Sequence, residues 1–132
     1  MQWSHVTPSS FPVNARKVYA ALSPRGVFYL NQGALLKLGD PPAVRLMYNA
    51  DRKVIGIAPV PIHTSESFLL RRKDGDRVAS RTFAAAPFCR EIGILPDRTI
   101  QFPDPKIEDG ILILDTTITI YAPRRGILKS RG

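Results

Sequence analysis

One order of short elements occurs twice along this chain, and it limits the folds that 132 residues can adopt. Each half shows the pattern of two strands, a short helix and two further strands. Twelve prolines and nine glycines separate these elements, which favours many short strands over a few long helices. Both helices are expected to end at a glycine that follows a branched aliphatic residue, at Leu38-Gly39 and at Ile92-Gly93. The sequence therefore predicts an α+β fold, mainly β, made of two β-β-α-β-β repeats.

The first repeat spans residues 15–61. Its expected strands are runs rich in β-branched and aromatic residues, bounded by turn residues: Val18–Leu22, Val27–Leu30, Val44–Tyr48 and Val54–Ile57. Ser23 to Gly26 has proline and glycine where a tight turn needs them. Asn31 is expected to cap a helix over residues 32–38, in which Leu35 and Leu38 are one turn apart and face the core.

The second repeat spans residues 66–121. Its expected strands are Ser67–Arg72, Arg77–Arg81, Arg98–Phe102 and Ile111–Leu114. Thr82 is expected to cap a helix over residues 84–92, with Phe88 and Ile92 facing the core, and residues 103–110 are expected to form a hairpin loop. Residues 116–121 alternate threonine with isoleucine, which predicts a prolonged last strand or an added edge strand with isoleucines inward and threonines outward.

Residues 15–122 are expected to form one domain, between an irregular segment at 1–14 and a basic, mobile tail at 123–132. The single cysteine, Cys89, excludes an internal disulfide and is expected to be packed in the second helix. Neither metal-ligand spacing nor a catalytic motif occurs, so we expect no cofactor and no enzyme activity. The start of the chain lacks a signal pattern, and no apolar run approaches the ~18 residues of a membrane helix. These features favour a cytoplasmic protein without membrane contact.

The order of the first repeat, with its Pro24-Arg25-Gly26 turn and its helix ending at Leu38-Gly39, resembles the AbrB-like family of transition-state regulators, SpoVT proteins and MazE-type antitoxins. The resemblance covers residues 17–59 and, more loosely, residues 67–115. It implies a swapped-hairpin barrel in which two units, related by a pseudo-twofold axis, complete each other's sheets. A chain with both units is similar to the MraZ arrangement. Family members commonly have proline directly before the short helix, where this chain has Asn31.

The chain also resembles small bacterial proteins of unassigned function, which share the spacing from Gly26 to Leu30-Asn31 followed by Leu38-Gly39. That group implies no activity.

Nineteen lysines and arginines against eleven acidic residues give a net charge of +8, which favours an acidic partner such as nucleic acid. The family resemblance implies that basic residues at the start of a unit and around its first turn contact DNA. The candidate nucleic-acid-binding residues are therefore Arg16, Lys17, Arg25, Arg71, Arg72, Lys73, Arg77 and Arg81. The alternative for these eight residues is that they are solvated surface charges that bind no ligand.

The leading functional hypothesis is a small cytoplasmic protein that binds nucleic acid, with duplex DNA favoured, as an AbrB-like transcriptional regulator or antitoxin. A second hypothesis is a non-enzymatic protein-interaction module, including a homo-oligomer. A third is a binder of single-stranded nucleic acid that stacks bases on aromatic strand residues. The aromatic candidates are Phe28, Tyr29, Tyr48, Phe68 and Phe83, although such residues usually belong to the core.

Overall fold

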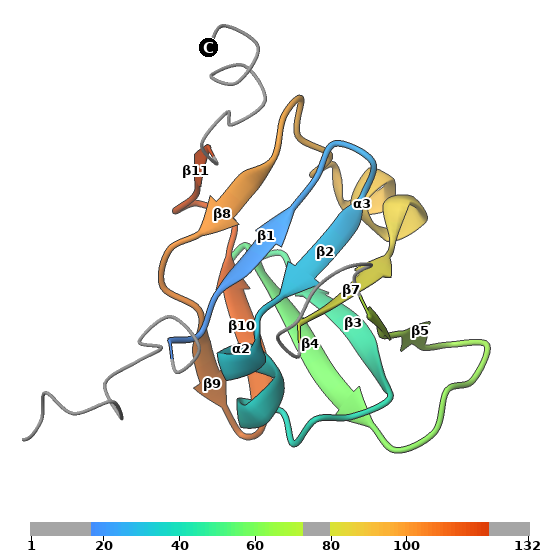
Figure 1. Ribbon diagram of the computed structural model, residues 1–132. Coiled ribbons are helices and arrows are strands. Elements are labelled where there is room, and N and C mark those ends of the chain that lie inside the picture. Colours follow the sequence, from blue (N-terminus) through green and yellow to red (C-terminus); the bar gives the residue numbers. More distant parts are fainter. Residues whose placement is uncertain (1–16, 73–79, 122–132) are drawn as a thin grey trace, which may run out of the picture.

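The computed structural model describes residues 17–72 and 80–121, which form two antiparallel sheets and two short helices (Figure 1). The six-stranded sheet has the order β11-β8-β1-β2-β7-β6, and the five-stranded sheet has the order β5-β3-β4-β10-β9. In Figure 1 the six-stranded sheet lies in front of the five-stranded one. The prediction of an α+β fold that is mainly β is therefore confirmed.

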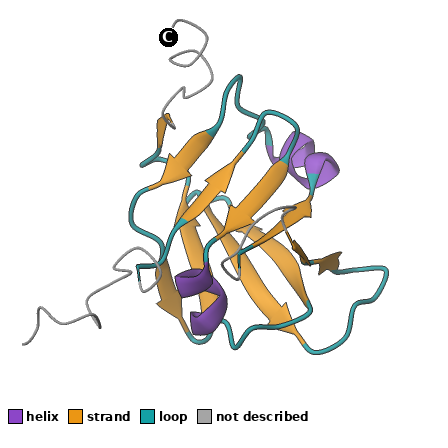
Figure 2. Cartoon of the chain, viewed as in Figure 1, coloured by secondary structure: helices purple, strands orange, loops and turns teal. Residues whose placement is uncertain are grey.

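In each sheet, two adjacent strands from the first half of the sequence lie between strands from the second half. The six-stranded sheet contains β1 (Ala20–Leu22), β2 (Val27–Leu30), β6 (Arg71–Arg72), β7 (Arg81–Ala84), β8 (Ile100–Phe102) and β11 (Ile120–Tyr121). The five-stranded sheet contains β3 (Ala43–Asn49), β4 (Val54–Val60), β5 (Phe68–Leu69), β9 (Lys106–Glu108) and β10 (Ile111–Asp115). The helices are α2 (Gln32–Lys37) and α3 (Ala86–Ile92), and they lie at opposite ends of the layered sheets (Figure 2).

The hydrophobic core lies between the two sheets, because every second strand residue points inward. Phe28 on β2 lies opposite Phe83 on β7, and their rings stack with centroids 4.9 Å apart. The paired strands β4 and β10 contribute four fully buried aliphatic side chains: Ile55, Ile57, Leu112 and Leu114. Leu35 and Leu38 of the first helix region are buried in the same core, as predicted.

Asn31 caps α2, as its position before the helix predicts. Its side-chain oxygen accepts hydrogen bonds from the backbone N–H of Ala34 at 2.9 Å and of Tyr19 at 3.0 Å. Its side-chain nitrogen donates to the carbonyl oxygen of Lys17 at 2.6 Å. One side chain therefore stabilises the helix start and joins it to the segment that enters β1.

The turn between β1 and β2 is held against the start of α3. Gly26 adopts φ +81°, and its carbonyl oxygen accepts a hydrogen bond from the backbone N–H of Ala85 at 2.8 Å. A Cβ atom at position 26 would lie only 2.5 Å from the Cα atom of Ala86. The turn requires glycine both for its left-handed conformation and for this close approach.

The second half departs from the predicted elements in several places. The expected strand at residues 67–72 is divided between β5 and β6, which belong to different sheets. Thr82 lies inside β7 rather than at a helix cap, and α3 follows Ala85, with proline in its first turn. The predicted hairpin loop at 103–110 contains β9. Phe88 and Ile92 are only partly buried, because α3 places Cys89 fully inside instead.

The chain after β10 does not alternate as expected. The carboxylate of Asp115 accepts hydrogen bonds from the backbone N–H of Thr117 at 2.9 Å and from its hydroxyl at 2.6 Å, which forms a turn. An edge strand, β11, then begins at Ile120. Ile118 and Ile120 are 54% and 52% exposed, so the prediction that these isoleucines face inward is wrong.

No ladder joins the two sheets within residues 17–72 and 80–121, so these residues do not form the closed barrel that the resemblance implies. The predicted irregular start at 1–14 and the predicted tail at 123–132 lie outside the described residues. Among the helices that the structure describes, none has the length and apolar character needed to cross a membrane.

Candidate nucleic-acid interface

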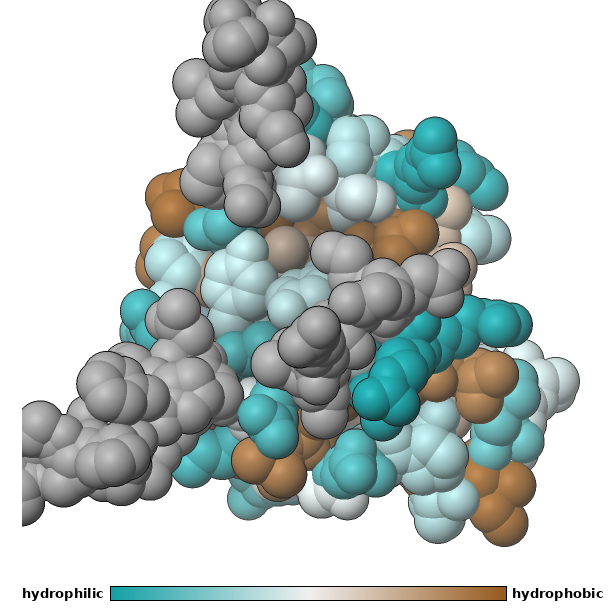
Figure 3. Space-filling model, viewed as in Figure 1, coloured by the Kyte–Doolittle hydropathy of each residue, from teal (hydrophilic) through white to brown (hydrophobic). Residues whose placement is uncertain are grey.

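The ladder register brings one row of residues together on the solvent side of the six-stranded sheet. The row crosses β8, β1, β2, β7 and β6, and it consists of Gln101, Ala21, Tyr29, Thr82 and Arg71. Neighbouring positions on the same strands, such as Phe28 and Phe83, point into the core. Because side chains alternate along a strand, the row points away from the core. We call this side of the six-stranded sheet the outer face; it is the side seen in Figure 3, where pale residues of intermediate hydropathy lie beside teal hydrophilic ones.

Two tyrosines meet on the outer face. Tyr19 lies two residues before Ala21, and its ring contacts that of Tyr29 edge-on, with centroids 5.7 Å apart and planes at 69°. Burial, followed by the neighbouring Tyr29, raises the pKa of Tyr19, while a hydrogen bond with the Gln101 side chain opposes this shift. The Tyr19 phenol therefore stays protonated at neutral pH and retains its hydrogen-bond donor.

Basic side chains lie at the margins of the outer face. Arg71 is exposed at the β6 end of the row, and Lys17 is exposed two residues before Tyr19. Arg25 is exposed on the β1–β2 turn, at the end of β2 that begins with Val27. Guanidinium and ammonium groups in these positions are available to contact phosphate groups of a ligand lying on the face.

The ladder separates Arg72 and Arg81 from this group. Arg72 pairs with Arg81, which in turn pairs with the buried Leu30, so both arginines lie on the other side of the sheet. Arg81 is half-buried, and its Nη1 donates a hydrogen bond to the carbonyl oxygen of Ser80 at 2.9 Å. The sequence analysis predicts one site that contains Arg71, Arg72 and Arg81, whereas the strand register places only Arg71 on the outer face.

Three of the predicted site residues, Arg16, Lys73 and Arg77, lie outside the described residues. Lys73 and Arg77 belong to the segment between β6 and β7. The described residues that flank this segment, Arg72 and Arg81, lie beside Leu30, at the far end of β2 from Arg25. These flanking residues and the β1–β2 turn thus lie at opposite ends of β2, which spans about 10 Å at about 3.4 Å per residue.

The outer face carries no acidic side chain among its described strand positions. These positions are Ala21, Val27, Tyr29, Arg71, Thr82, Ala84, Gln101 and Ile120. A polyanion bound there meets no carboxylate from the strands themselves, which lowers the electrostatic cost of binding.

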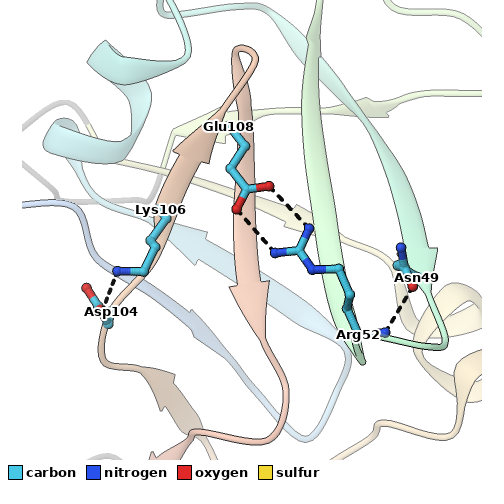
Figure 4. A network of polar contacts seen from close by, with 5 residues as sticks. All are labelled: Asn49, Arg52, Asp104, Lys106 and Glu108. Atoms are coloured by element: carbon cyan, nitrogen blue, oxygen red, sulfur yellow. Dashed lines mark hydrogen bonds and ion pairs between the residues drawn. The ribbon is translucent and has the colours of Figure 1, made fainter.

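The solvent side of the five-stranded sheet differs, because two of its cations are paired with carboxylates. The guanidinium of Arg52 donates two hydrogen bonds, each 3.2 Å long, to the carboxylate of Glu108, and Lys106 pairs with Asp104 at 2.8 Å (Figure 4). The Arg52 guanidinium lowers the pKa of Glu108, which keeps this carboxylate charged. Mixed charge on that side makes it a poorer surface for an anionic ligand than the outer face.

The aromatic candidates divide between core and surface. Phe28 and Phe83 are buried, and Tyr48 and Phe68 pack against the core. Tyr29 alone of the five lies on the outer face. Sequence reasoning missed Tyr19 and Gln101. The alternation of Tyr19 with the buried Ala20 could have suggested the first, but no local signal brings Gln101 beside it.

A second surface feature lies at the β11 edge. A groove of about 430 Å³ is lined by Leu95, Ile120 and Tyr121 among others, and the Arg98 guanidinium lies 3.8 Å from the centroid of the Tyr121 ring. Within residues 17–72 and 80–121, no group of three or more His, Cys, Asp or Glu side chains is placed to hold a metal ion.

Neither a protein-family model, nor a curated protein, nor a solved structure matches this chain. The chemistry of the outer face therefore carries the functional conclusion.

Proposed function

We propose that the protein binds nucleic acid through the outer face of its six-stranded sheet. The observation that carries this proposal is the combination of exposed Arg71 and Lys17 with two tyrosines and an amide on a face whose strands present no carboxylate. Lysine and arginine neutralise phosphates, while aromatic rings and polar side chains contact sugars and bases. The net charge of +8 adds a long-range attraction for the same ligand.

The proposal includes the AbrB-like pseudo-twofold arrangement. Several pairings support it. Two antiparallel ladders, β2 with β7 and β4 with β10, join matching strands of the two repeats. Six of the seven remaining ladders form counterpart pairs if β5 and β6 together correspond to β1, and β8 and β9 together to β3. The pairs are β1–β2 with β6–β7, β3–β4 with β9–β10, and β1–β8 with β5–β3, whereas β11–β8 has no counterpart. Such reciprocity is expected when two units contribute hairpins to common sheets. A cytoplasmic transcriptional regulator or antitoxin is the biological role that accompanies this arrangement.

The test measures the salt dependence of binding to fluorescein-labelled duplex and single-stranded oligonucleotides between about 50 and 200 mM salt. Each lost phosphate contact should reduce the slope of log K against log salt by about 0.9 for duplex and about 0.7 for a single strand. The variants Lys17→Gln and Arg71→Gln should each reduce the slope.

Arg45→Gln is the matched control, because Arg45 is an exposed arginine on β3 in the other sheet. It removes the same charge and should leave the slope nearly unchanged. Equal effects of Arg45→Gln and Arg71→Gln would mean that attraction depends on total charge, and the outer face would lose its role.

The β11 edge favours a second candidate, the protein-interaction module. Among the described strands, β11 pairs only with β8, and Leu95, Ile118, Ile120 and Tyr121 are all at least 40% exposed. An edge strand beside apolar side chains is a surface to which another strand adds. If no oligonucleotide binds at low salt, and if light scattering shows a dimer that Ile120→Lys dissociates, the module replaces the nucleic-acid proposal.

A further inference from the structure

We infer that the protein dimerises with a second copy of itself through the free edge of β3, with the two β3 strands antiparallel and centred on Met47. The two five-stranded sheets then continue into one sheet. The inference concerns a part of the molecule that the proposed function does not use. It depends on the free backbone groups of the edge, on the side chains beside them and on how both match a second copy.

Only the first part of β3 is covered on the side away from β4. β4 pairs with every residue of β3, from Ala43 to Asn49, whereas β5 pairs only with Ala43 and Val44. Among the strands that the structure describes, none lies beside residues 45–49 on this side. The edge of the five-stranded sheet is therefore open to another strand along these residues.

The burial of the inward side chains agrees with an open edge. Leu46 and Tyr48 pack against the core but are only partly buried. Their counterparts on the next strand, Ile55 and Ile57, are fully buried. Solvent therefore reaches the inner layer beside β3, where a further strand would cover these two side chains.

The ladder pattern shows which backbone groups face the edge. The N–H of Leu70, which directly follows β5, donates to the carbonyl oxygen of Pro42 at 3.0 Å. Because hydrogen-bonded positions alternate along an antiparallel strand, the even-numbered residues of β3 face this edge. Pro59 on β4 lies opposite one of them, where no N–H is needed. Leu46 and Tyr48 thus each present one N–H and one C=O, and no described residue pairs with these groups.

A second β3 strand matches this edge. Leu46 and Tyr48 are each one residue from Met47, so in an antiparallel pair centred on Met47 each Leu46 exchanges two hydrogen bonds with the Tyr48 of the other copy. All of the edge-facing groups of these residues are then satisfied. The two Met47 side chains, each 43% exposed, lie directly opposite each other, and their flexible thioethers pack together readily.

The charges at the ends of this ladder are complementary. Arg45 is exposed and forms no ion pair with another described residue. In the antiparallel pair it lies toward the end of the other copy's β3, where Asn49 and the exposed Asp51 follow. Each arginine therefore lies toward an amide and a carboxylate, and no like charges are directly opposite each other.

Two other edges of the described sheets are less suited to pairing. β6 consists of two exposed arginines, and β9 contains Lys106 and Glu108. Charged side chains on an edge strand oppose the addition of another strand. Between Leu46 and Tyr48, β3 has no charged residue.

The dimer has a consequence for the proposed function, and this step rests on that function. Directly opposed residues of paired strands point to the same side of a sheet, so both six-stranded sheets lie on one side of the joined sheet. The two outer faces are then turned the same way. A nucleic acid long enough to contact both gains affinity from the second contact.

The net charge of +8 on each copy opposes association. Salt screens this repulsion, so the dimer should become tighter as salt is added, whereas nucleic-acid binding should become weaker. A contact of so few residues is small, so the association is expected to be weak and to depend on protein concentration.

Sedimentation equilibrium without nucleic acid, at several protein and salt concentrations, measures the dimer dissociation constant. Met47→Lys places two lysines opposite each other and should raise this constant by about 2- to 30-fold. Ile120→Lys is the matched control, because it adds the same charge at an isoleucine that is 52% exposed on the β11 edge. It should leave the constant nearly unchanged. Unfolding midpoints establish that both variants are folded.

Met47→Cys provides a second measurement that does not depend on the folding of Met47→Lys. Opposed residues at the centre of the ladder have Cα atoms about 4.5 Å apart, which suits a disulfide. Mild oxidation with oxidised glutathione should therefore link two copies of Met47→Cys rapidly. Leu36→Cys, at a side chain that is 63% exposed on α2, is the control for random collisions and should link slowly. Cys89 is fully buried and does not compete.

A monomer at every protein and salt concentration would overturn the inference and leave the β3 edge to a strand of a different protein. A dimer that Ile120→Lys dissociates and Met47→Lys does not would place the contact at the β11 edge instead. Equal linking rates for Met47→Cys and Leu36→Cys would also overturn the pairing. Oligonucleotide binding is measured separately, so failure of the dimer and failure of the proposed function are distinguishable.

Discussion

Replacing Gly26 with alanine is expected to destabilise the protein much more than the same change at Gly39. Both glycines have positive φ angles, +81° and +84°, at which an L-residue with a Cβ atom costs about 1–2 kcal/mol. Their surroundings differ. A Cβ atom at position 26 would lie 2.5 Å from the Cα atom of Ala86, whereas one at position 39 would have no neighbour within 4 Å.

The neighbour at Gly26 is backbone, so the clash is relieved only if the β1–β2 turn and the start of α3 move apart. Overpacking of this kind costs about 1–3 kcal/mol. The same movement stretches the 2.8 Å hydrogen bond from the Ala85 N–H to the Gly26 carbonyl, which is worth about 0.5–1.5 kcal/mol. Together with the conformational cost, Gly26→Ala should lose about 3–6 kcal/mol and Gly39→Ala about 1–2 kcal/mol.

Urea unfolding followed by circular dichroism measures both losses, provided that the slopes of the transitions agree. Since small domains are stable by only about 5–15 kcal/mol, failure of Gly26→Ala to fold while Gly39→Ala folds is the extreme form of the expected result. Equal midpoint shifts for the two variants would refute the reasoning, because they would show that the turn is not packed against α3.

Two further predictions concern the core and the charged side of the five-stranded sheet. Leu35→Ala should cost about 2–5 kcal/mol in the same unfolding assay, because Leu35 is 1% exposed. Leu36→Ala, at a side chain that is 63% exposed, should cost less than about 0.5 kcal/mol. Similar losses in the two variants would mean that Leu35 does not face the core. Arg52 lowers the pKa of Glu108 from its ordinary value of 4.5, so the stability contributed by this ion pair is present above that pH and is lost as the pH falls through the lower folded value. As the pH is lowered, the free energy of unfolding should therefore fall more steeply in the unchanged protein than in Glu108→Gln. Added salt should reduce this difference, because it screens the ion pair. Identical pH profiles of the two proteins would contradict the ion pair.

The first half of the fold follows closely from its sequence because its signals are local. The strand at residues 27–30 pairs with β1 across a short turn, and the cap at Asn31 and the helix end at Gly39 depend on interactions within a few residues. A turn residue or a capping side chain acts on its own neighbours, so its effect is the same in any surrounding fold. The strands β3 and β4 only extend beyond the predicted ends.

The second half was harder to predict because long-range contacts decide its elements. Thr82 has the hydroxyl of a helix cap, yet its backbone pairs with Tyr29 from the first half, which makes it part of a strand. The residues on either side of Leu70 belong to different sheets, because β5 pairs with β3 and β6 pairs with β7. These pairing partners are distant in the sequence, so residues 67–72 alone do not indicate the division. Propensity is a weak guide wherever tertiary pairing competes with it.

The candidate site shows the same division. The prediction from the sequence included Arg71 but placed it in one group with Arg72. In the strand register, these two neighbours lie on opposite sides of the sheet. The contact between Tyr19 and Gln101 arises only because β1 and β8 are adjacent in the sheet. A surface built from four or five strands therefore becomes visible once the strand order is known, and composition alone does not reveal it.

The charge pattern of the outer face is not a requirement of folding. The core fixes the inward positions, such as Phe28 and Phe83, but packing leaves the outward positions free. On the five-stranded sheet this freedom produced both signs of charge and the Arg52–Glu108 pair. At the described strand positions of the outer face it produced no carboxylate, although the chain has eleven acidic residues. If that difference serves an anionic ligand, removing a positive charge from the outer face must weaken oligonucleotide binding more than removing one elsewhere. The variants Arg71→Gln and Arg45→Gln make this comparison.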